Sequence, residues 1–478
     1  MAVVGGGCAG LSAALQLASL SVGSPIDLFH DGAAPARDVG VGIWSTGLNP
    51  LAGSEAMDWL YKELVAKGQW VDEVGYRVPR GDWLLKSVLT EDPGLLFLRE
   101  SDFLVSLRKA VHLEEHRGSI QVHSASPVQR LDEESPHPWS ARLQLVDGRF
   151  TDRDYHLIIA ADGTHSKLRQ VYGGHNAATR TTTTVNTGTS ALPGPTELPP
   201  PTSAWSDEQQ KEAIRIQDRG YTVFRGNAVL PHTGQPRNVG SFQTWGECQS
   251  MRFATVPMPI AAGSSEERQA WFITTDNPDI PKEADPEVRL DMLRHEFRDW
   301  HQPIPEMLDH TPAAEIVMER AIAHRHCMGP VTSMNEVIGR VRGRRPPSSG
   351  EGPVLVYVGD AFMTIDPILA QGFTVALEGA AALRTSVDAA CQQPSEGLAF
   401  CPSELRTAIR QRHEARIERL VCLLRATELV QALGQPTGGV GGSINLRLLR
   451  PLAQMVPNSI KAPIFDRILR YSLGWPKN

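Results

Sequence analysis

A glycine-rich turn at the start of the chain constrains its fold more than any other feature. A short apolar strand precedes residues 5–10, which read Gly-Gly-Gly-Cys-Ala-Gly, and a helix with apolar residues at i, i+3, i+4 and i+7 follows. We expect Gly5 to allow the reversal, Gly7 to let the backbone approach a pyrophosphate, and Gly10, preceded by Ala9, to let the helix pack on the sheet. The turn therefore predicts a dinucleotide at a helix N-terminus, where free N–H groups favour negative charge.

The next strand, expected over residues 25–31, should carry the group that binds the adenosine ribose. The dinucleotide fingerprint places a carboxylate about 20 residues after the glycines, at the end of this strand. His30 aligns with that position, and Asp31 follows it by one residue. Both stay candidates for the ribose contact, because Asp31 can equally open a turn with Gly32.

Charge and cysteine usage exclude several kinds of partner. The 478 residues suffice for two or three domains, and a formal net charge of −7 argues against nucleic acid, whose phosphates favour a basic face. No apolar run approaches the roughly 18 residues of a membrane span, so no transmembrane segment is expected. The six cysteines are scattered without a Cys-x-x-Cys pair, and His324 and His326 are spaced wrongly for a helical metal pair. We expect a cytoplasmic protein that binds no metal.

Changes of pattern along the chain predict three regions. Alternating strand and helix patterns indicate a nucleotide-binding domain made of residues 1–175 and 310–395. Aromatic and β-branched runs indicate a β-rich substrate domain over residues 176–309, with a Thr- and Pro-rich insertion at about 181–205. Residues 396–478 read as a helical tail with an amphipathic stretch near its end. We expect that stretch to pack on the protein's own body, with a membrane surface or a partner as the alternative.

Two further motifs follow buried strands. Asp162 and Gly163 come directly after one apolar run, and Asp360 follows another. The carboxyl ends of parallel strands are where open α/β sheets bind ligands. Pro367 and Gly372 then shape a loop that delivers a helix N-terminus to the same place, where its dipole favours negative charge on a ring system.

In this order and context, the three motifs resemble the class A flavoprotein monooxygenases. These are single-component FAD enzymes similar to aromatic-ring hydroxylases, salicylate hydroxylase and zeaxanthin epoxidase. The resemblance runs from residue 2 to about residue 390. It implies an α/β fold with a Rossmann-like FAD-binding domain of the p-hydroxybenzoate hydroxylase type, an interleaved β-sheet substrate domain and a helical C-terminal tail.

The resemblance also implies a role for each motif. The glycine turn would hold the FAD pyrophosphate, and Asp162 and Gly163 would touch both FAD and the nicotinamide cofactor. Asp360 would hydrogen-bond ribityl or ribose hydroxyls, Pro367 would lie over the reactive side of the flavin, and backbone N–H groups after it would face the pyrimidine edge. The implied cofactor contacts are Gly5, Gly7, Ala9, Gly10, His30, Asp31, Arg37, Arg99, Asp162, Gly163, Asp360, Pro367, Ala370, Gln371 and Gly372.

The chain departs from the family pattern in two places. Met363 stands where a histidine commonly follows Gly-Asp-Ala, and Ala370 replaces the first glycine of Gly-Gln-Gly. Arg37 and Arg99 stand where the family often places arginine against the cofactor, and each can equally be a surface cation. Neither departure should prevent flavin binding, and both point to a divergent subfamily.

The activity that the resemblance implies is an FAD-dependent monooxygenation. NADPH or NADH would reduce the flavin, O2 would add to give a C4a-hydroperoxide, and one oxygen would pass to an aromatic or polycyclic small molecule by hydroxylation or epoxidation. Because the cofactor carries this chemistry, no catalytic acid or base is assigned. The alternatives are a flavin-dependent halogenase, a reductase, or a non-catalytic flavin-binding interaction protein. The Trp-x-Trp-x-Ile-Pro stretch of tryptophan-type halogenases is absent from the sequence.

Overall fold

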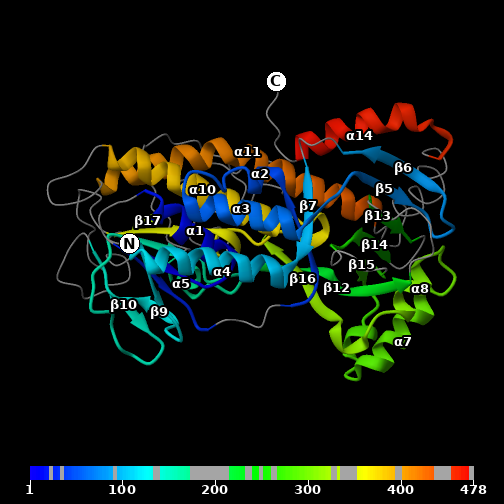
Figure 1. Cartoon of the computed structure of the whole chain (residues 1–478), viewed down its shortest axis with the longest axis horizontal. Coiled ribbons are helices and arrows are strands. Elements are labelled where there is room, and N and C mark those ends of the chain that lie inside the picture. The colour runs from blue at the N-terminus through cyan, green and yellow to red at the C-terminus, as the bar shows by residue number, and fades with distance from the viewer. Residues whose placement is uncertain are drawn as a thin grey trace, which may run out of the picture.

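The computed structural model of the chain contains two large β-sheets that lie side by side, with helices packed on both (Figure 1). The predicted Thr- and Pro-rich insertion lies outside the residues that it describes. The described residues are 1–20, 25–32, 37–89, 94–132, 140–172, 215–231, 240–246, 251–259, 266–324, 331–333, 353–392, 401–434 and 454–472.

A six-stranded sheet forms the half of the molecule that contains the N-terminus. Its order β17-β18-β11-β1-β2-β8 places the N-terminal strand near the centre, and every pair except β17–β18 is parallel. The four central strands are short, buried on both faces and apolar except for Asp27 of β2, which is typical of parallel sheets. In sheet order the strands are β17 (Val331–Ser333), β18 (Val354–Tyr357), β11 (Leu157–Ala160), β1 (Ala2–Val4), β2 (Ile26–Phe29) and β8 (Ile120–His123).

Both faces of this sheet are covered, because successive side chains of its strands point to opposite sides. Val3 packs with the apolar sides of α1, α3, α4 and α10, whereas Ala2 and Val4 pack with α5, α11 and the β9–β10 hairpin. The predicted Rossmann-like α/β architecture is therefore confirmed. The covering elements are α1 (Cys8–Ala18), α3 (Glu55–Lys67), α4 (Glu100–His116), α5 (Lys167–Tyr172), α10 (Gly372–Cys391), α11 (Pro402–Gly434), β9 (Val128–Leu131) and β10 (Leu143–Leu145).

A seven-stranded sheet forms the other half, with helices α7 (Pro286–Phe297) and α8 (Ile304–Asp309) packed on its outer face. The β-rich pattern predicted for residues 176–309 supplies four of its strands, and β5, β6 and β16 come from outside that range. The domain boundaries themselves stay a prediction. In sheet order the strands are β16 (Val317–His324), β12 (Ile216–Pro231), β15 (Glu266–Thr275), β14 (Arg252–Pro257), β13 (Gly240–Trp245), β5 (Glu73–Arg77) and β6 (Trp83–Val88).

A small three-stranded sheet connects the two halves. Trp44 and Phe97 of this sheet pack against Val256 and Ala270 on the inner face of the seven-stranded sheet. The contact is apolar, so it holds the two halves together by burial rather than by charge. The strands are β3 (Gly40–Trp44), β7 (Leu95–Arg99) and β4 (Gln69–Trp70), and the short helix α2 (Ser45–Leu48) follows β3.

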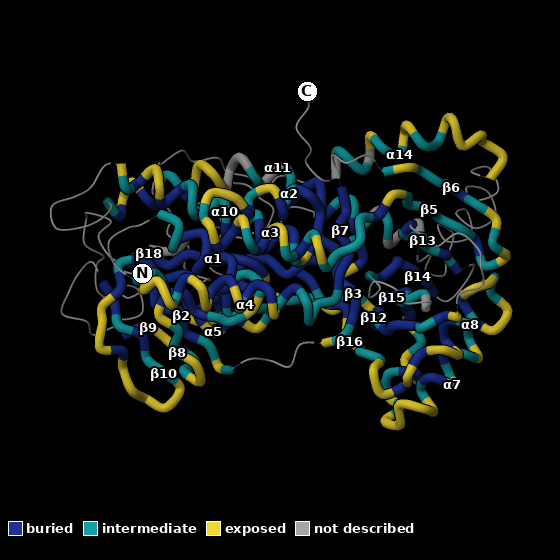
Figure 2. Tube along the Cα trace, in the orientation of Figure 1, coloured by how far each residue is buried: buried dark blue, intermediate teal, exposed yellow. Residues whose placement is uncertain are grey.

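The C-terminal region is helical, as predicted. Helix α14 (Asn458–Ser472) lies along β6, where the Asn458 side chain donates to Lys86 O at 2.6 Å. Figure 2 shows exposed positions along its outer side. Ile460 and Ile464 of this helix are exposed. No helix in the described part of the chain is long and apolar enough to cross a membrane.

Candidate active site

The glycine turn has the geometry that its sequence predicts. Gly5 has a φ of +126°, and a Cβ placed there would lie 2.1 Å from Ala161 O. A Cβ at Gly10 would lie 1.9 Å from Gly5 O, so only glycine lets helix α1 approach the strand this closely. Gly7 caps α1, and a Cβ there would meet nothing within 4 Å. The space in front of the helix N-terminus is therefore open to a phosphate group.

A cavity of about 260 Å³ lies beside this turn. Gly6 and His30 line it together with Arg108, His112 and Glu115 of helix α4. The His30 Nδ1 accepts from Gly32 N at 3.1 Å, which fixes the imidazole at the end of β2. Of the two residues predicted for the ribose contact, His30 lines this cavity and the exposed Asp31 does not.

The second motif is joined to the third by one buried arginine. Asp162 Oδ2 accepts from the backbone N–H of Lys167 at 2.9 Å and so holds the start of α5. Arg169 of that helix is almost fully buried and donates to the carbonyl oxygens of Asp360, at 2.8 Å, and Ala361, at 3.0 Å. It also donates to Thr164 O. The guanidinium thus holds together two segments that lie far apart along the chain.

The third motif touches the first. Gly359 has a φ of +59°, and a Cβ there would lie 2.4 Å from the Ala9 side chain, so the strand end and the glycine turn are in contact. Asp360 follows this contact and is exposed, and its Oδ2 accepts from Thr164 Oγ1 at 3.2 Å. Asp162 Oδ1 is buried with no hydrogen-bond partner among the described residues. The three predicted motifs therefore converge, and their carboxylates retain acceptor capacity for a ligand.

The loop of residues 366–372, called here the flavin loop, presents an open side. Asp366 caps its first turn by accepting from Ile368 N at 3.0 Å. Pro367, Ala370 and Gly372 are exposed, and nothing lies within 4 Å of a Cβ placed at Gly372. Gly372 begins helix α10, whose first N–H groups have no acceptor within the helix. These positions could face a flavin ring.

Ala370 differs from its predicted role. Its N–H donates to Pro367 O at 3.0 Å, so it is engaged within the loop rather than available to a pyrimidine edge. The residue also has a φ of +52°, a left-handed conformation that glycine adopts more easily than alanine. The family's usual glycine at this place therefore has a physical reason. The roles that the resemblance implies for Gln371 and Gly372 stay predictions.

The two predicted arginines make ion-pair contacts within the protein, and their contact with the cofactor stays a prediction. Arg37 forms an ion pair with Glu319 of β16, and Arg99 lies 3.6 Å from Asp38 Oδ1.

Met363, which replaces the family's histidine, is buried in the apolar cluster behind the flavin loop. Burial raises the pKa of Cys8 to about 12, which makes it a space-filling thiol rather than a reactive one.

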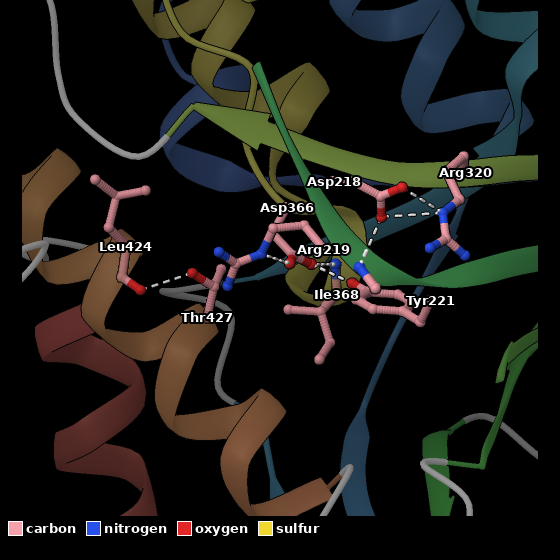
Figure 3. A network of polar contacts seen from close by, with 9 residues as sticks. Asp218, Arg219, Tyr221, Arg320, Asp366, Ile368, Leu424 and Thr427 are labelled. Atoms are coloured by element: carbon pink, nitrogen blue, oxygen red, sulfur yellow. Dashed lines mark hydrogen bonds and ion pairs between the residues drawn. The ribbon is translucent and has the colours of Figure 1, made fainter. Parts of the chain in front are cut away.

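Sequence reasoning missed a polar network that ties the flavin loop to the seven-stranded sheet (Figure 3). Asp366 is buried and accepts from Arg219 Nε at 2.9 Å and from the hydroxyl of Tyr221, both on β12. His324 of β16 accepts from Thr364 N at 2.8 Å, just before the loop. The Asp-Pro sequence at the start of a loop was the available signal, since aspartate before proline is a common turn cap.

The residues present fit FAD at the positions where the resemblance places it. Four features lie around the carboxyl ends of β1, β11 and β18. They are an open helix N-terminus, a cavity beside the ribose position, an exposed carboxylate at a strand end and the open flavin loop. No cluster of three or more metal-ligating side chains occurs among the described residues. That a nucleotide with a ring system binds at these positions stays a prediction.

Comparisons with known proteins agree with this geometry. The chain is 26% identical to the aurachin C monooxygenase/isomerase of Stigmatella aurantiaca over 234 residues, which is 49% of this chain and 50% of that protein. It therefore matches about half the length of this curated relative. Klebsiella pneumoniae HpxO, in a complex with FAD and uric acid, has a TM-score of 0.65 at 17% identity, with 98% of this chain and 96% of HpxO covered.

A mutant of Pseudomonas aeruginosa PqsL has a TM-score of 0.58 at 13% identity, with 98% of this chain and all of that chain covered. No family model matches the sequence. The fold is that of the FAD-dependent monooxygenases, and the resemblance drawn from the three motifs is confirmed at this level.

Proposed function

We propose that the protein is an FAD-dependent monooxygenase that uses NADPH or NADH and O2 to hydroxylate or epoxidise an aromatic or polycyclic small molecule. The observation that carries this proposal is the meeting of the three motifs, with Gly359 against Ala9 and Arg169 bound to the carbonyl oxygen of Asp360. Side-by-side strands β1, β11 and β18 present all three at one edge of the sheet. Such an edge is where open α/β sheets bind nucleotides.

Each part of the site has a separate task in this proposal. The N-terminus of α1 at Gly7 binds the pyrophosphate, His30 contacts the adenosine ribose, and Asp360 binds ribityl or ribose hydroxyls. Bound FAD supplies the hydride-accepting and oxygen-activating chemistry. The protein's own contribution is to hold the ring, exclude water and orient the substrate.

The flavin loop supports negative charge on the ring. The N–H groups of Gln371 and Gly372 open helix α10, so the positive end of its dipole points out of the loop. Asp366 fixes the conformation of this loop through its cap on Ile368 N and its bonds to β12. The donors are therefore held in place before any charge develops, which is where electrostatic stabilisation is most effective.

The substrate class rests on the relatives and on the second sheet. The curated relative is an aurachin C monooxygenase/isomerase, and solved neighbours include structures of HpxO with uric acid and of tetracycline destructase Tet(55). These names favour a small ring compound as the substrate. A cytoplasmic location also stays a prediction, which fractionation of the producing cells would check.

Purification followed by a turnover screen tests the proposal. We expect a yellow protein with flavin absorbance, whose oxidation of NADPH or NADH rises when phenols, indoles, polyketides, isoprenoids or aurachin C are supplied. Mass spectrometry under ¹⁸O₂ should show one labelled oxygen in the product. Halogen in the product would favour the halogenase alternative, and flavin binding without turnover of any compound would favour the interaction protein.

A pair of variants ties the result to the site. Asp360→Ala should lose most of its bound FAD, because it removes the exposed carboxylate at the strand end. Asp147→Asn alters an exposed hairpin carboxylate and should keep the flavin. Colourless wild-type protein after incubation with excess FAD would contradict the proposal.

A further inference from the structure

Helix α14 turns an apolar side away from the protein (Figure 2). Among the described residues, thirteen large apolar side chains are exposed, and four of them lie within ten residues on this helix or just before it. Met455 is 79% exposed, Ile460 and Ile464 are each 55% exposed, and Val456 is the fourth. Single exposed apolar residues are normal on a protein surface, but a group of them marks an interaction site.

The apolar residues of α14 form two sides of the helix. Ile460 and Ile464 are spaced i, i+4 and so share the outer side. Phe465 and Leu469, also spaced i, i+4, face the protein: the Phe465 ring lies 5.5 Å from that of Tyr76, and Leu469 packs on the apolar cluster of the connecting sheet. The inner side alone therefore accounts for the packing of α14, and the outer side serves no contact within the described residues.

Polar contacts with the edge strand β6 fix the rotation of the helix. The Asn458 side chain accepts from Lys86 N at 3.1 Å and donates to Lys86 O at 2.6 Å. Lys461 donates to Leu84 O of the same strand. An edge strand has free backbone groups, and these side chains engage them. Because the helix is held at two positions along β6, its outer apolar side points away from the protein.

The charge of the C-terminal segment is opposite to that of the whole chain. Residues 435–478 contain six lysines or arginines and one aspartate, whereas the formal net charge of the chain is −7. Asp466 pairs with Arg470 at 2.9 Å. Arg467 follows Ile464 by three positions on the outer side, is exposed, and makes no ion pair within the described part of the chain. An uncompensated positive charge therefore adjoins the exposed isoleucines.

An anionic lipid surface suits both properties of this outer side. A helix in the membrane interface buries its apolar side chains about 5–10 Å into the headgroup and acyl boundary, while its cations contact anionic lipids. A stable protein interface buries about 800 Å² on each partner, more than one row of a few side chains supplies. Helix α14 has 15 residues, and no helix among the described residues can cross a membrane, so α14 would lie on the surface.

We propose that α14 docks the protein on the surface of an anionic membrane. Ile460 and Ile464 enter the interface, and Arg467 contacts the anionic headgroups. Strand β6 and the edge of the seven-stranded sheet then face the bilayer. The inference goes beyond the proposed function and does not depend on the flavin site.

Flotation of the purified full-length protein with lipid vesicles tests the inference. One set of vesicles is phosphatidylcholine alone, and the other is an equal mixture of phosphatidylcholine and phosphatidylglycerol. We expect the wild type to bind the anionic vesicles about tenfold or more tightly than the neutral ones, since each cation near such a surface adds to the attraction. Added salt should weaken the binding, because it screens these charges.

Variants assign the binding to the outer side of α14. A double variant, Ile460→Ser with Ile464→Ser, should bind anionic vesicles about tenfold or more weakly than the wild type. Arg467→Gln should lower the affinity for anionic vesicles about threefold or more and leave that for neutral vesicles unchanged. Val288→Ser alters an exposed apolar residue of α7 and should bind like the wild type. Melting curves and flavin content establish that each variant is folded.

Three results would overturn the inference: no binding to anionic vesicles, equal binding to both kinds, or full binding by the double isoleucine variant. Sedimentation without vesicles gives a fourth, since a wild-type dimer that the double variant lacks would assign the outer side to a second copy of the chain. Flotation needs neither flavin nor turnover. Vesicle binding by an inactive protein would therefore contradict the proposed function alone, and turnover by a protein that does not float would contradict only the docking.

Discussion

The two large sheets position their polar groups by different means. In the six-stranded sheet, close backbone approach positions these groups. Gly5, Gly10 and Gly359 allow segments to approach so closely that a Cβ would collide with its neighbour. In the seven-stranded sheet, side-chain contacts position the polar groups. Arg219 and Tyr221 hydrogen-bond Asp366 in the other half of the molecule. Short glycine motifs predict close backbone approach, whereas side-chain pairing depends on strand register. The first kind of site can be found in a sequence, and the second is seen only once the strands are aligned.

The largest effect is expected from removal of Arg169, a side chain that positions the motifs of the six-stranded sheet. Arg169→Met removes the guanidinium donor from the carbonyl oxygens of Thr164, Asp360 and Ala361. Asp360 O keeps a contact with the Thr364 hydroxyl at 3.3 Å, so the other two carbonyl oxygens lose most. At about 1–3 kcal/mol for each unsatisfied group, we expect a loss of about 3 kcal/mol or more in the free energy of unfolding, together with loss of FAD. Urea denaturation and flavin absorbance measure both.

Arg149→Met is the control for this experiment, since Arg149 is exposed and pairs with nearby Asp147. It should change stability by less than about 0.5 kcal/mol. A stable Arg169→Met protein that keeps its flavin would show that backbone geometry alone holds the motifs together.

The link between the two sheets can be broken at Asp366. Asp366→Asn removes the charge that Arg219 and Tyr221 share, and the Arg219 side chain, at 19% exposed, loses this ion pair while it stays mostly buried. We expect a loss of about 2–3 kcal/mol, below the full value for a buried pair because Arg219 reaches some solvent. The visible spectrum of bound FAD should shift, because the loop that Asp366 caps changes shape.

Tyr221→Phe separates the two roles of this network. It leaves the Asp366 ion pair in place and removes one hydrogen bond, so a smaller loss of about 1 kcal/mol is expected. If Asp366→Asn and Tyr221→Phe gave the same stability and the same flavin spectrum as the wild type, the network would have no positioning role.

The glycine turn offers a matched pair of substitutions within one motif. Gly10→Ala places a Cβ 1.9 Å from Gly5 O, so the helix must shift, at a cost of about 1–3 kcal/mol to the apoprotein. Gly7→Ala meets nothing within 4 Å and should leave apoprotein stability within about 1 kcal/mol of the wild type. Its methyl group instead occupies the space proposed for the pyrophosphate, so the affinity for FAD should fall. Tight FAD binding by Gly7→Ala would show that the phosphates do not bind at this turn.

The same contrast explains how much the sequence could predict. The glycines, the strand ends at Asp162 and Asp360, and the helical tail followed from local patterns, because each is encoded within a few residues. The pairing of β5 and β6 with β13, and of β16 with β12, did not, since long-range strand pairing leaves no local mark. The contacts of Asp366 and Arg219 depend on that pairing. Arg37 was expected at the cofactor for its place in the motif, and the same pairing brings Glu319 to it.

The smallest effect on stability is expected at Ala370, an alanine in a left-handed backbone conformation that glycine adopts more easily. Ala370 has φ +52° and is exposed, so Ala370→Gly relieves left-handed strain without emptying any packed space. We expect a gain of about 0.5–1 kcal/mol in the free energy of unfolding. Ala125, also at φ +52° and exposed, lies outside the flavin loop and is the matched control for backbone strain alone, since its neighbours Ser124 and Ser126 hydrogen-bond His30. Ala125→Gly should give a similar gain in stability, whereas Ala370→Gly should also alter the FAD affinity, because it changes the conformational freedom of the flavin loop. An FAD affinity of Ala370→Gly equal to that of the wild type would mean that the strain at Ala370 has no bearing on how the loop meets the ring.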